Sequence, residues 1–417
     1  MKQERVLVAM SGGVDSSLTA ALLAVQGYDV IGATMRLSED SRESLSGENN
    51  GETPSSVADA QRVADVLGIP HYVFDFTASF EQTVIGYFLD EYQCGPTPNP
   101  CIVCNRHIKF GALLRKGEEL GAQYIATGHY ARVERGADGI YRLRKGQDTA
   151  KDQSYVLYHL NQETLARVLL PLGNFSKNET RRMAEEEYHL PVAHKAESQE
   201  ICFVPHDDYK TYLRKKRPAA VQRGEIVDQA GNVLGVHEGI SFYTIGQRRG
   251  LGIAAPEPLY VTALDAVHNH VVVGTAEEVF ARELTASDLS WTMWESLDEV
   301  RMAHAKIRYG KREAEARIMP LDGNRLRVRF TEPQRAVTPL CSTRETLCWG
   351  AASLMLCLRD TFIHGERGDS NDEPQCKDQD FLLRTVWCCG IICGALLVFS
   401  HSYQDAGICH GSNRAGA

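Results

Sequence analysis

The stretch Ser11–Ser17 (SGGVDSS) constrains the fold of this chain more than any other part of the sequence. It follows the apolar run 5–10, which is typical of a buried parallel strand, and it precedes residues 18–26, which are typical of a helix. Glycines let the backbone approach a phosphate, and the free amides and dipole of a following helix favour negative charge. The stretch therefore predicts an anion site, with a plain serine-capped turn as the alternative.

The pattern SGGxDS after a strand resembles the PP-loop of ATP pyrophosphatases. It is not a P-loop of the GxxxxGK[ST] kind, because no lysine follows the glycines. The resemblance implies that ATP is cleaved to AMP and pyrophosphate, and that the adenylyl group activates an oxygen that is then displaced.

Strand-like and helix-like segments alternate through residues 5–127. Further strands are expected at 29–35, 72–76 and 124–127, and helices at 55–67, 79–92 and 110–120. This alternation predicts an α/β fold with a doubly wound, Rossmann-like parallel sheet and with ligands at the carboxyl ends of its strands. Ser11–Ser17, Met35 and the pair Gly128-His129 all follow such ends.

Beyond about residue 205 the pattern changes to basic residues, glycines and short β-type runs. We expect a small connecting domain and then a small, incomplete β-barrel domain. The predicted domains are 1–204 (ATP-binding and catalytic), 205–280 (connecting), 281–339 (truncated barrel) and an aberrant tail at 340–417.

Composition and charge limit the class of protein. Hydrophobic residues make up 43% and charged residues 24%, which is normal for a soluble globular protein. No signal peptide is evident, and the longest apolar run, 386–400, is too short to span a membrane. We therefore expect a cytoplasmic protein with no membrane partner. The net charge of −9 disfavours a coat of nucleic acid, but local basic patches at 214–217 and at 308–312 would suffice to bind it; a solvated charged face is the alternative.

Cysteines supply the next signal. Cys101 and Cys104 form a CxxC, which is compatible with zinc, redox or iron–sulfur chemistry. Without a second CxxC before residue 340, a structural zinc site is poorly supported, and we predict no metal site. Cys202 lies far downstream and, taken alone, reads as an ordinary small core residue.

Five further motifs make the family resemblance specific. With the PP-loop they resemble, in the same order, a bacterial tRNA-specific 2-thiouridylase over roughly residues 5–339. The motifs are PTPNPCIVCNRHIKFG (96–111), ATGHYAR (126–132), KDQSYVL (151–157), SQEICFV (198–204) and YTIGQRRGLG (243–252).

The resemblance implies a function and a set of site residues. The implied reaction is ATP-dependent 2-thiolation of the wobble uridine of tRNA, with Cys104 as nucleophile and Cys202 as carrier of a persulfide. The ATP site would comprise Ala9, Met10, Ser11, Gly12, Gly13, Val14, Asp15, Ser16, Met35 and Gly128. The target base would meet Asn99, Pro100 and Cys101, and tRNA would meet His129, Lys151, Asp152, Gln153, Arg308, Tyr309 and the connecting domain.

The residue types suit this chemistry. Adenylation of the uridine carbon-2 oxygen turns a poor leaving group into AMP, and sulfur then arrives as a strong nucleophile from a thiolate or persulfide. Mg²⁺ would neutralise the pyrophosphate, since the loop has no lysine. Cys104 would attack Cys202 to release sulfur and leave a transient disulfide. The uridine must be flipped out of its stack. The expected partners are tRNA and a persulfide donor protein, and the chain is expected to be a monomer.

Two departures and two rival functions stay open. Some family members carry Asp where this chain has Cys101, so an acid/base role there is unassigned, and Cys101, Cys104 and Cys202 could instead ligate an iron–sulfur cluster. The rivals are a PP-loop synthetase that acts on a small molecule and a catalytically dead nucleotide- or tRNA-binding relative. The paired cysteines and the basic second half argue against the synthetase.

The family pattern stops at residue 339. Four cysteines precede Leu340 and the other eight of the twelve follow it, in a sequence that begins LCSTRETLCWGAAS. Degenerate codons for 340–353, read two bases later, permit LLYEGDVVLGSGI, which is typical of the family's β-rich ending. We therefore predict a frameshift near Pro339, in the gene or in its sequencing, that removes the last barrel strands and a tRNA-facing Gln. An open barrel edge would impair folding or tRNA affinity and leave the ATP site intact.

Overall fold

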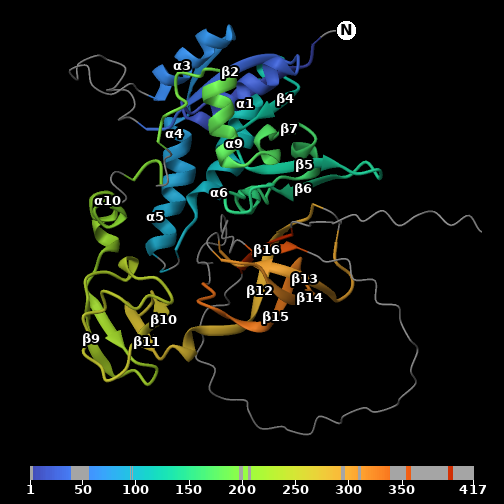
Figure 1. Ribbon diagram of the computed structural model, residues 1–417. Coiled ribbons are helices and arrows are strands. Elements are labelled where there is room, and N and C mark those ends of the chain that lie inside the picture. The colour runs from blue at the N-terminus through green and yellow to red at the C-terminus, as the bar shows by residue number, and fades with distance from the viewer. Residues whose placement is uncertain are drawn as a thin grey trace, which may run out of the picture.

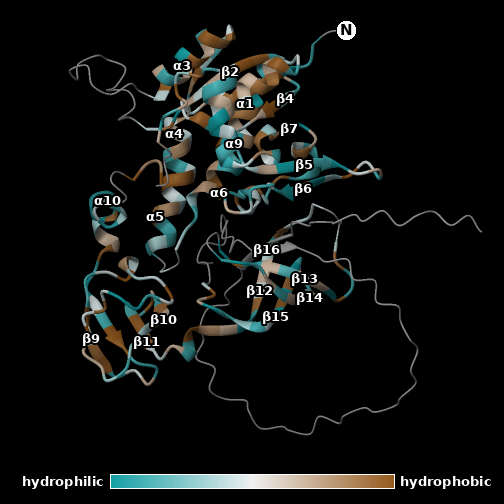
Figure 2. Ribbon diagram, in the orientation of Figure 1, coloured by the Kyte–Doolittle hydropathy of each residue, from teal (hydrophilic) through white to brown (hydrophobic). Residues whose placement is uncertain are grey.

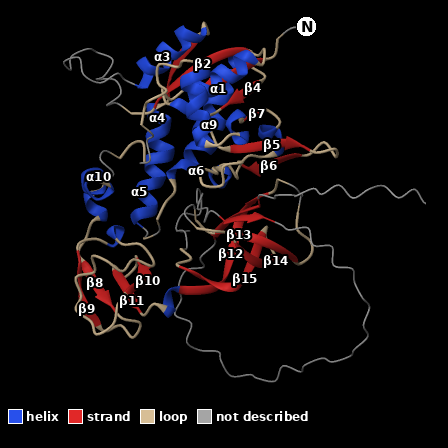
Figure 3. Cartoon of the chain, in the orientation of Figure 1, coloured by secondary structure: helices blue, strands red, loops and turns tan. Residues whose placement is uncertain are grey.

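The computed structural model describes residues 3–38, 56–93, 95, 97–196, 201–204, 208–292, 296–308 and 311–338, with the backbone of 354–357 and 393–397. It has an α/β body formed by the N-terminal half of the chain, a small sheet below it and a barrel beside that sheet (Figure 1). Helices surround the upper sheet, whereas strands dominate the other two parts (Figure 3). Among the described residues, no helix is long and apolar enough to cross a membrane.

The α/β body is built on a five-stranded parallel sheet of order β3-β2-β1-β4-β7, which confirms the predicted fold class. Its strands are β1 (Arg5–Ala9), β2 (Asp29–Arg36), β3 (His71–Asp75), β4 (Tyr124–Ala126) and β7 (Val168–Leu169). Strand order reverses at β1, which pairs with β2 on one side and β4 on the other, and ligands of such sheets bind at this switch point. Apolar side chains on both faces of β1 are fully buried, as expected for a central parallel strand.

Two helical layers cover the sheet. The helices that follow β1 and β2 are α1 (Val14–Val25) and α3 (Ser56–Leu67). The longer insertion after β3 comprises α4 (Thr77–Phe80), the π-helix η1 (Glu81–Ile85), α5 (Gly86–Gln93), α6 (Pro100–Cys104), the π-helix η2 (Asn105–Leu113) and α7 (Leu114–Glu119). The expected helix at 110–120 therefore begins ten residues early, at Pro100. Proline is favoured at the first helical position and Asn99 caps it, so this helix start contains the CxxC.

A hairpin and several short helices complete the α/β body. The hairpin β5 (Ala131–Arg135) and β6 (Tyr141–Lys145) is strongly hydrophilic and lies on the side that faces the barrel (Figure 2). Gln162 and Lys145 tie this region to the barrel, through Thr292 and Glu313. The remaining elements are η3 (Ser154–Val156), α8 (Gln162–Leu165), η4 (Pro171–Asn174), α9 (Lys177–Arg182) and η5 (Met183–Glu187).

The connecting region has a sheet of order β10-β11-β8-β9 and shares its core with the α/β body. Its elements are α10 (Tyr209–Lys216), η7 (Pro218–Ala220), β8 (Gly224–Val227), β9 (Val233–His237), η8 (Ile240–Phe242), β10 (Tyr260–Asp265), β11 (His270–Gly274) and η9 (Glu277–Val279). The basic patch at 214–217 serves this junction: Lys216 pairs with Glu81 at 2.9 Å, and Arg217 pairs with Asp90 at 2.8 Å. Lys216 and Arg217 therefore form ion pairs within the protein itself.

The barrel contains β12 (Phe280–Ser290), β13 (Arg301–Lys306), β14 (Ala314–Leu321), β15 (Arg325–Arg335), β16 (Leu354–Cys357) and β17 (Cys393–Leu397). The predicted incomplete barrel needs correction, because the ring β12-β15-β14-β13-β16-β17 is closed. β16 pairs with β13 and β17 with β12, so both edges that the first four strands would leave open are covered. Apart from these two backbone segments, the tail at 340–417 lies outside the described residues.

Candidate active site

The loop between β1 and α1 forms the cradle that the sequence predicts. Gly12 has a φ of +69°, and Gly13 precedes α1 without any side-chain cap. The hydroxyl of Ser16 accepts from the Ser11 amide at 3.1 Å and donates to the Gly13 carbonyl at 3.1 Å. These bonds fix the loop internally, while the first amides of the twelve-residue helix α1 stay uncapped. The arrangement suits an anion such as a phosphate.

Two glycines are required by close packing around this loop. A Cβ on Gly12 would collide with the backbone oxygen of Ser56, at the start of α3. A Cβ on Gly128 would lie 2.8 Å from the Asp15 carbonyl carbon and 2.9 Å from the Ser16 nitrogen. The residue that follows β4 therefore packs closely against the start of α1, next to the loop.

Two lysines that the sequence analysis missed neutralise the carboxylates around the loop. Lys177 Nζ donates to both carboxylate oxygens of Asp15, at 2.7 and 2.9 Å, and the Tyr130 hydroxyl donates to the same group at 2.8 Å. Lys195 Nζ donates to the Gly12 carbonyl at 3.0 Å and also pairs with Asp59. No sequence signal separates these lysines from surface lysines, since Lys177 follows a capping serine like any helix start.

Asp59 shows how strongly this cluster is held. Burial would raise the pKa of its carboxyl, but hydrogen bonds from Lys195 and Arg62 outweigh burial and lower that pKa below its ordinary value. The carboxylate is therefore charged and paired beneath Gly12. Because Asp15 and Asp59 are both engaged by lysines, neither offers a free carboxylate to Mg²⁺ in this structure.

The other residues that were predicted to bind ATP are buried or half-buried. Met10 is 2% exposed and lies against Gly32, and Ala9 and Val14 are also buried. These residues support the loop from beneath. Met35 is half-buried near the end of β2, where it packs against the hydrophobic core.

The CxxC lies at the start of a helix, and the structure brings Cys202 to it. The Asn99 side chain accepts from the Cys101 amide at 3.2 Å, Pro100 is buried, Cys101 is exposed and Cys104 is buried. Cys202 is exposed, and its neighbour Phe203 anchors the segment 201–204. The Phe203 ring packs edge-on against Phe88 at 5.1 Å and Phe80 at 5.6 Å.

The three thiols influence one another electrostatically. Burial raises the pKa of Cys104 to about 12, Lys109 opposes that rise, and Cys202 and Cys101 add to it. Desolvation by neighbouring atoms also raises the pKa of Cys202, although the residue as a whole is exposed, and Cys101 adds to that shift. All three cysteines are unbridged, and the described residues include no group of three His, Cys, Asp or Glu arranged to hold a metal ion.

The residues predicted to contact tRNA lie in different environments. His129 is buried, its Nδ1 lies 2.7 Å from the Thr127 hydroxyl, and burial followed by the charge of Lys109 lowers its pKa well below the usual value. Arg308 is bound through its guanidinium to the Ala336 carbonyl, and at 3.3 Å to Thr338. Tyr309 lies outside the described residues.

Lys151, Asp152 and Gln153 form a turn against the β5–β6 hairpin. The buried Asp152 carboxylate accepts from the Gly146 amide at 3.0 Å and the Ser154 hydroxyl at 2.9 Å. The Gln153 side chain accepts from the Tyr130 amide at 2.9 Å. These two side chains hold the turn, and Lys151, which precedes them, is half-buried.

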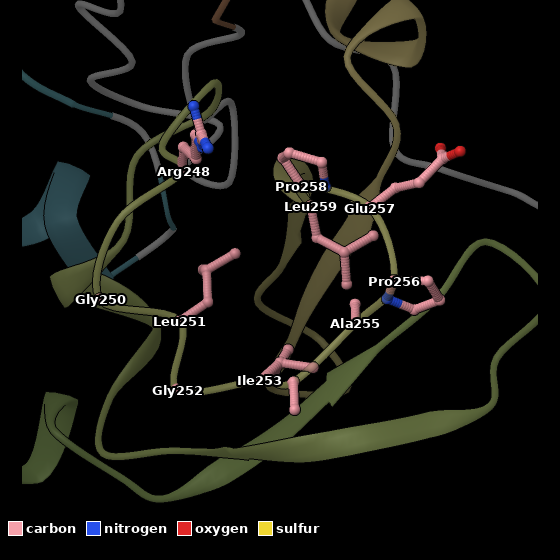
Figure 4. Close-up of a pocket in the computed structure, with 11 residues that line it drawn as sticks. Arg248, Gly250, Leu251, Gly252, Ile253, Ala255, Pro256, Glu257, Pro258 and Leu259 are labelled. Atoms are coloured by element: carbon pink, nitrogen blue, oxygen red, sulfur yellow. The ribbon is translucent and has the colours of Figure 1, made fainter.

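A separate hollow lies away from these residues. It has a volume of about 600 Å³ and is lined entirely by residues 248–259 of the loop between η8 and β10. Leu251, Ile253 and Leu259 point into it and Glu257 points away (Figure 4). None of the predicted site residues lines it, so we assign it no part in the chemistry.

Comparisons with known proteins agree with the motifs. Family models match as a tRNA methyl transferase HUP domain over residues 4–206, a tRNA methyl transferase PRC-barrel domain over 210–275 and an aminomethyltransferase beta-barrel domain over 281–339. Remote solved structures include a 4-thiouridine synthetase–RNA complex with bound ATP, at 17% identity and a TM-score of 0.32, covering 52% of this chain and 51% of that one.

Curated relatives are much more similar. The tRNA-specific 2-thiouridylase MnmA of Pelotomaculum thermopropionicum is 50% identical over 341 residues, covering 81% of this chain and 93% of the relative. The protein of the same name from Geobacter metallireducens is 51% identical over 340 residues, covering 81% and 92%. Identity at this level over nearly the whole length of these relatives means that the chain belongs to the tRNA-specific 2-thiouridylase family.

Proposed function

We propose that this protein catalyses ATP-dependent 2-thiolation of the wobble uridine of tRNA. The observation that carries the proposal is the closeness of two cysteines from distant parts of the sequence. Cys202 lies near enough to Cys104 to raise the pKa of that thiol, in the same domain as an uncapped PP-loop. Amide-forming PP-loop synthetases need no such pair of thiols, so the pair favours sulfur transfer. We also infer the three-domain division at 204, 280 and 339.

The loop would hold ATP. Ser11, Gly12, Gly13 and the first amides of α1 would bind phosphates, with Met35 and Gly128 at the sides of the nucleotide. ATP supplies the adenylyl group that activates the carbon-2 oxygen of the uridine. Lys177 and Lys195 hold the loop's carboxylates neutralised, which lowers the electrostatic cost of bringing a polyphosphate close. Asp15 and Asp59 are both paired with lysines, so neither is proposed as a ligand of Mg²⁺.

The cysteines would deliver sulfur. A persulfide donor protein loads Cys202 as Cys202–S–SH, and Cys104 loses its proton and attacks the Cys202 sulfur. A Cys104–Cys202 disulfide forms, the bond between Cys202 and the outer sulfur breaks, and HS⁻ leaves. HS⁻ adds to carbon 2 of the adenylated uridine, and AMP departs. An external thiol reductant then returns the disulfide to two thiols, so that two electrons balance the reduction of the persulfide sulfur.

The substrate base would reach the thiols from the capped start of α6. Asn99, Pro100 and Cys101 lie next to Cys104 in sequence, and Cys101 is the exposed side chain of that helix start. A uridine there must leave its stack, as base-modifying enzymes require. His129, which burial keeps neutral, Lys151, Arg308 and Tyr309 are the proposed tRNA contacts, and Asp152 and Gln153 would act by shaping the Lys151 turn.

One assay tests this function against its rivals. Purified full-length protein is incubated with ATP, tRNA and a persulfide donor, and 2-thiouridine, AMP and pyrophosphate are measured by mass spectrometry. We expect RNA-dependent AMP formation with one 2-thiouridine per AMP, lost in Cys104→Ser and Cys202→Ser and retained in the surface variant Lys116→Met. AMP formed without need of RNA would indicate a small-molecule synthetase, and nucleotide binding without AMP would indicate a dead relative. Iron and visible absorbance in anaerobically purified protein would instead favour an iron–sulfur cluster on the cysteines over a persulfide on Cys202.

A further inference from the structure

Lys109 occupies a position set by the helix that contains the nucleophile. The α-helix α6 ends at Cys104 and continues directly as the π-helix η2, whose hydrogen bonds join residues five apart. Lys109 is therefore one hydrogen-bonded turn beyond Cys104. This local geometry gives the lysine the same general direction as the thiol.

Lys109 also lacks any partner within the described part of the chain. It is half-buried, yet no described carboxylate or acceptor bonds to it. Its neighbour on the same helical run, Lys116, is equally half-buried but pairs with Glu119 at 2.7 Å. In a protein with a net charge of −9, a half-buried cation left unpaired beside two cysteines indicates a site for an anion that forms or binds there.

Four other basic groups, on η2 or packed against its Phe110, are paired or have a lowered pKa. Arg106 pairs with Asp288 of β12 at 3.3 Å. Burial, followed by the charge of Arg106, lowers the pKa of His159 to about 3 and also lowers that of His107. His129, at the end of β4, is uncharged for the same first reason. Lys109 is thus the cation that acts on both Cys104 and Cys202, opposing the effect of burial at each.

We propose that Lys109 is a positioning residue of the sulfur-transfer step, whose fixed positive charge stabilises the Cys104 thiolate and the anionic sulfur released from Cys202. The inference rests on the proposed function. The thiol proton goes to solvent, the Cys104–Cys202 bond forms as the Cys202–S bond breaks, and HS⁻ leaves beside the lysine side chain. Cys101 from α6 and Cys202 from the segment 201–204 are the other titrating groups that face Cys104.

The test measures thiol reactivity without ATP or tRNA, so that it does not depend on the proposed function. Alkylation of Cys104 and Cys202 by iodoacetamide is followed at pH 8, peptide by peptide, in the full-length wild type and in Lys109→Met, Lys109→Arg and Lys116→Met. Loss of a nearby charge that shifts a thiol pKa by half a unit to one unit slows alkylation by about threefold to tenfold. We expect that slowing at both cysteines in Lys109→Met, and rates within about twofold of wild type in the arginine and Lys116 variants.

Three results would overturn the proposal. The first is a rate in Lys109→Met equal to that of wild type. The second is equal slowing in Lys116→Met. The third is a loss of ATP affinity in Lys109→Met with unchanged thiol reactivity, which would assign the lysine to the nucleotide. Misfolding would speed alkylation by exposing Cys104, so a slowed rate cannot come from unfolding, and Lys109→Gln replaces the methionine variant if that variant does not melt cooperatively.

Discussion

At the PP-loop two acidic side chains near the glycines are each paired with a lysine, whereas at the cysteine site one lysine and one buried amide oxygen have no partner among the described residues. Lys177 pairs with Asp15 and Lys195 with Asp59. Beside Cys104, the buried Asn105 Oδ1 has no hydrogen-bond partner in the described structure, and Lys109 pairs with no described residue. The charged side chains around the loop are thus paired before any ligand binds, whereas the first amides of α1 stay uncapped.

The difference suggests that the loop is arranged to bind nucleotide and the cysteine site to handle anionic sulfur. A loop whose side chains already bond to one another binds nucleotide at little cost in reorganisation. The sulfur site keeps both thiols protonated, because burial raises the pKa of Cys104 to about 12, and it holds an unpaired cation for the moment when anionic sulfur forms. A thiol kept neutral until the substrate arrives is protected from other electrophiles.

The largest expected effect separates the two regions. Cys104→Ser and Cys202→Ser each remove a sulfur that the transfer requires, so we expect thiolation to fall by at least about 1000-fold. ATP affinity, measured by isothermal calorimetry, should stay within about twofold of wild type, because the Ser16 hydroxyl makes its hydrogen bonds within the loop. A matched loss of ATP affinity would show that the regions form one site.

The next effect concerns the protonation of Cys104. With a pKa of about 12, its thiolate fraction rises tenfold for each pH unit below that value. Alkylation of Cys104 should therefore increase about 100-fold from pH 8 to pH 10, whereas an ordinary thiol levels off near pH 9. A plateau at Cys104 near pH 9 in the folded, ligand-free protein would contradict the protected thiol.

A smaller effect tests the rigidity of the loop. Gly128→Ala places a Cβ 2.8 to 2.9 Å from backbone atoms of Asp15 and Ser16 and must displace the start of α1. We expect a loss of about 1 to 3 kcal/mol in the free energy of unfolding and about tenfold weaker ATP binding, measured by urea denaturation and calorimetry. Gly86→Ala is the control, since its Cβ would meet only one atom, at an ordinary 3.6 Å. Equal behaviour of the two variants would mean that the loop tolerates displacement.

The smallest effect concerns the Asp59 ion pair. Lys195→Met leaves the buried Asp59 carboxylate with Arg62 alone, so we expect a loss of about 1 to 2 kcal/mol in unfolding free energy at pH 7. Because the folded pKa of Asp59 is lowered, its stabilisation is present above the unfolded value of about 3.9 and is lost as pH falls through the folded pKa. The difference between wild type and variant should therefore shrink from pH 5 to pH 3; a constant difference would mean that Lys195 does not act through Asp59.

Sequence reasoning went further for the loop than for the cysteine site. Ser11–Ser17 is local, so its strand, turn and helix could be predicted from consecutive residues, and Gly128 from its place after β4. Lys177 and Lys195 are brought to the loop by tertiary contacts with no periodic or spacing signal. The burial of Asp152 also depends on packing that a linear pattern does not encode, whereas the early start of α6 follows from the local pair Asn99-Pro100. The two strands that close the barrel pair with residues far upstream, and no family pattern covers them.

A single-turnover reaction tests the central claim most directly. Protein loaded with one persulfide at Cys202 is mixed with ATP and excess tRNA in the absence of reductant, then quenched with acid and digested for mass spectrometry. The account predicts one 2-thiouridine, one AMP and one Cys104–Cys202 disulfide for each chain that reacts. Formation of 2-thiouridine while Cys104 remains a free thiol, or at an unchanged yield in Cys104→Ser, would contradict it.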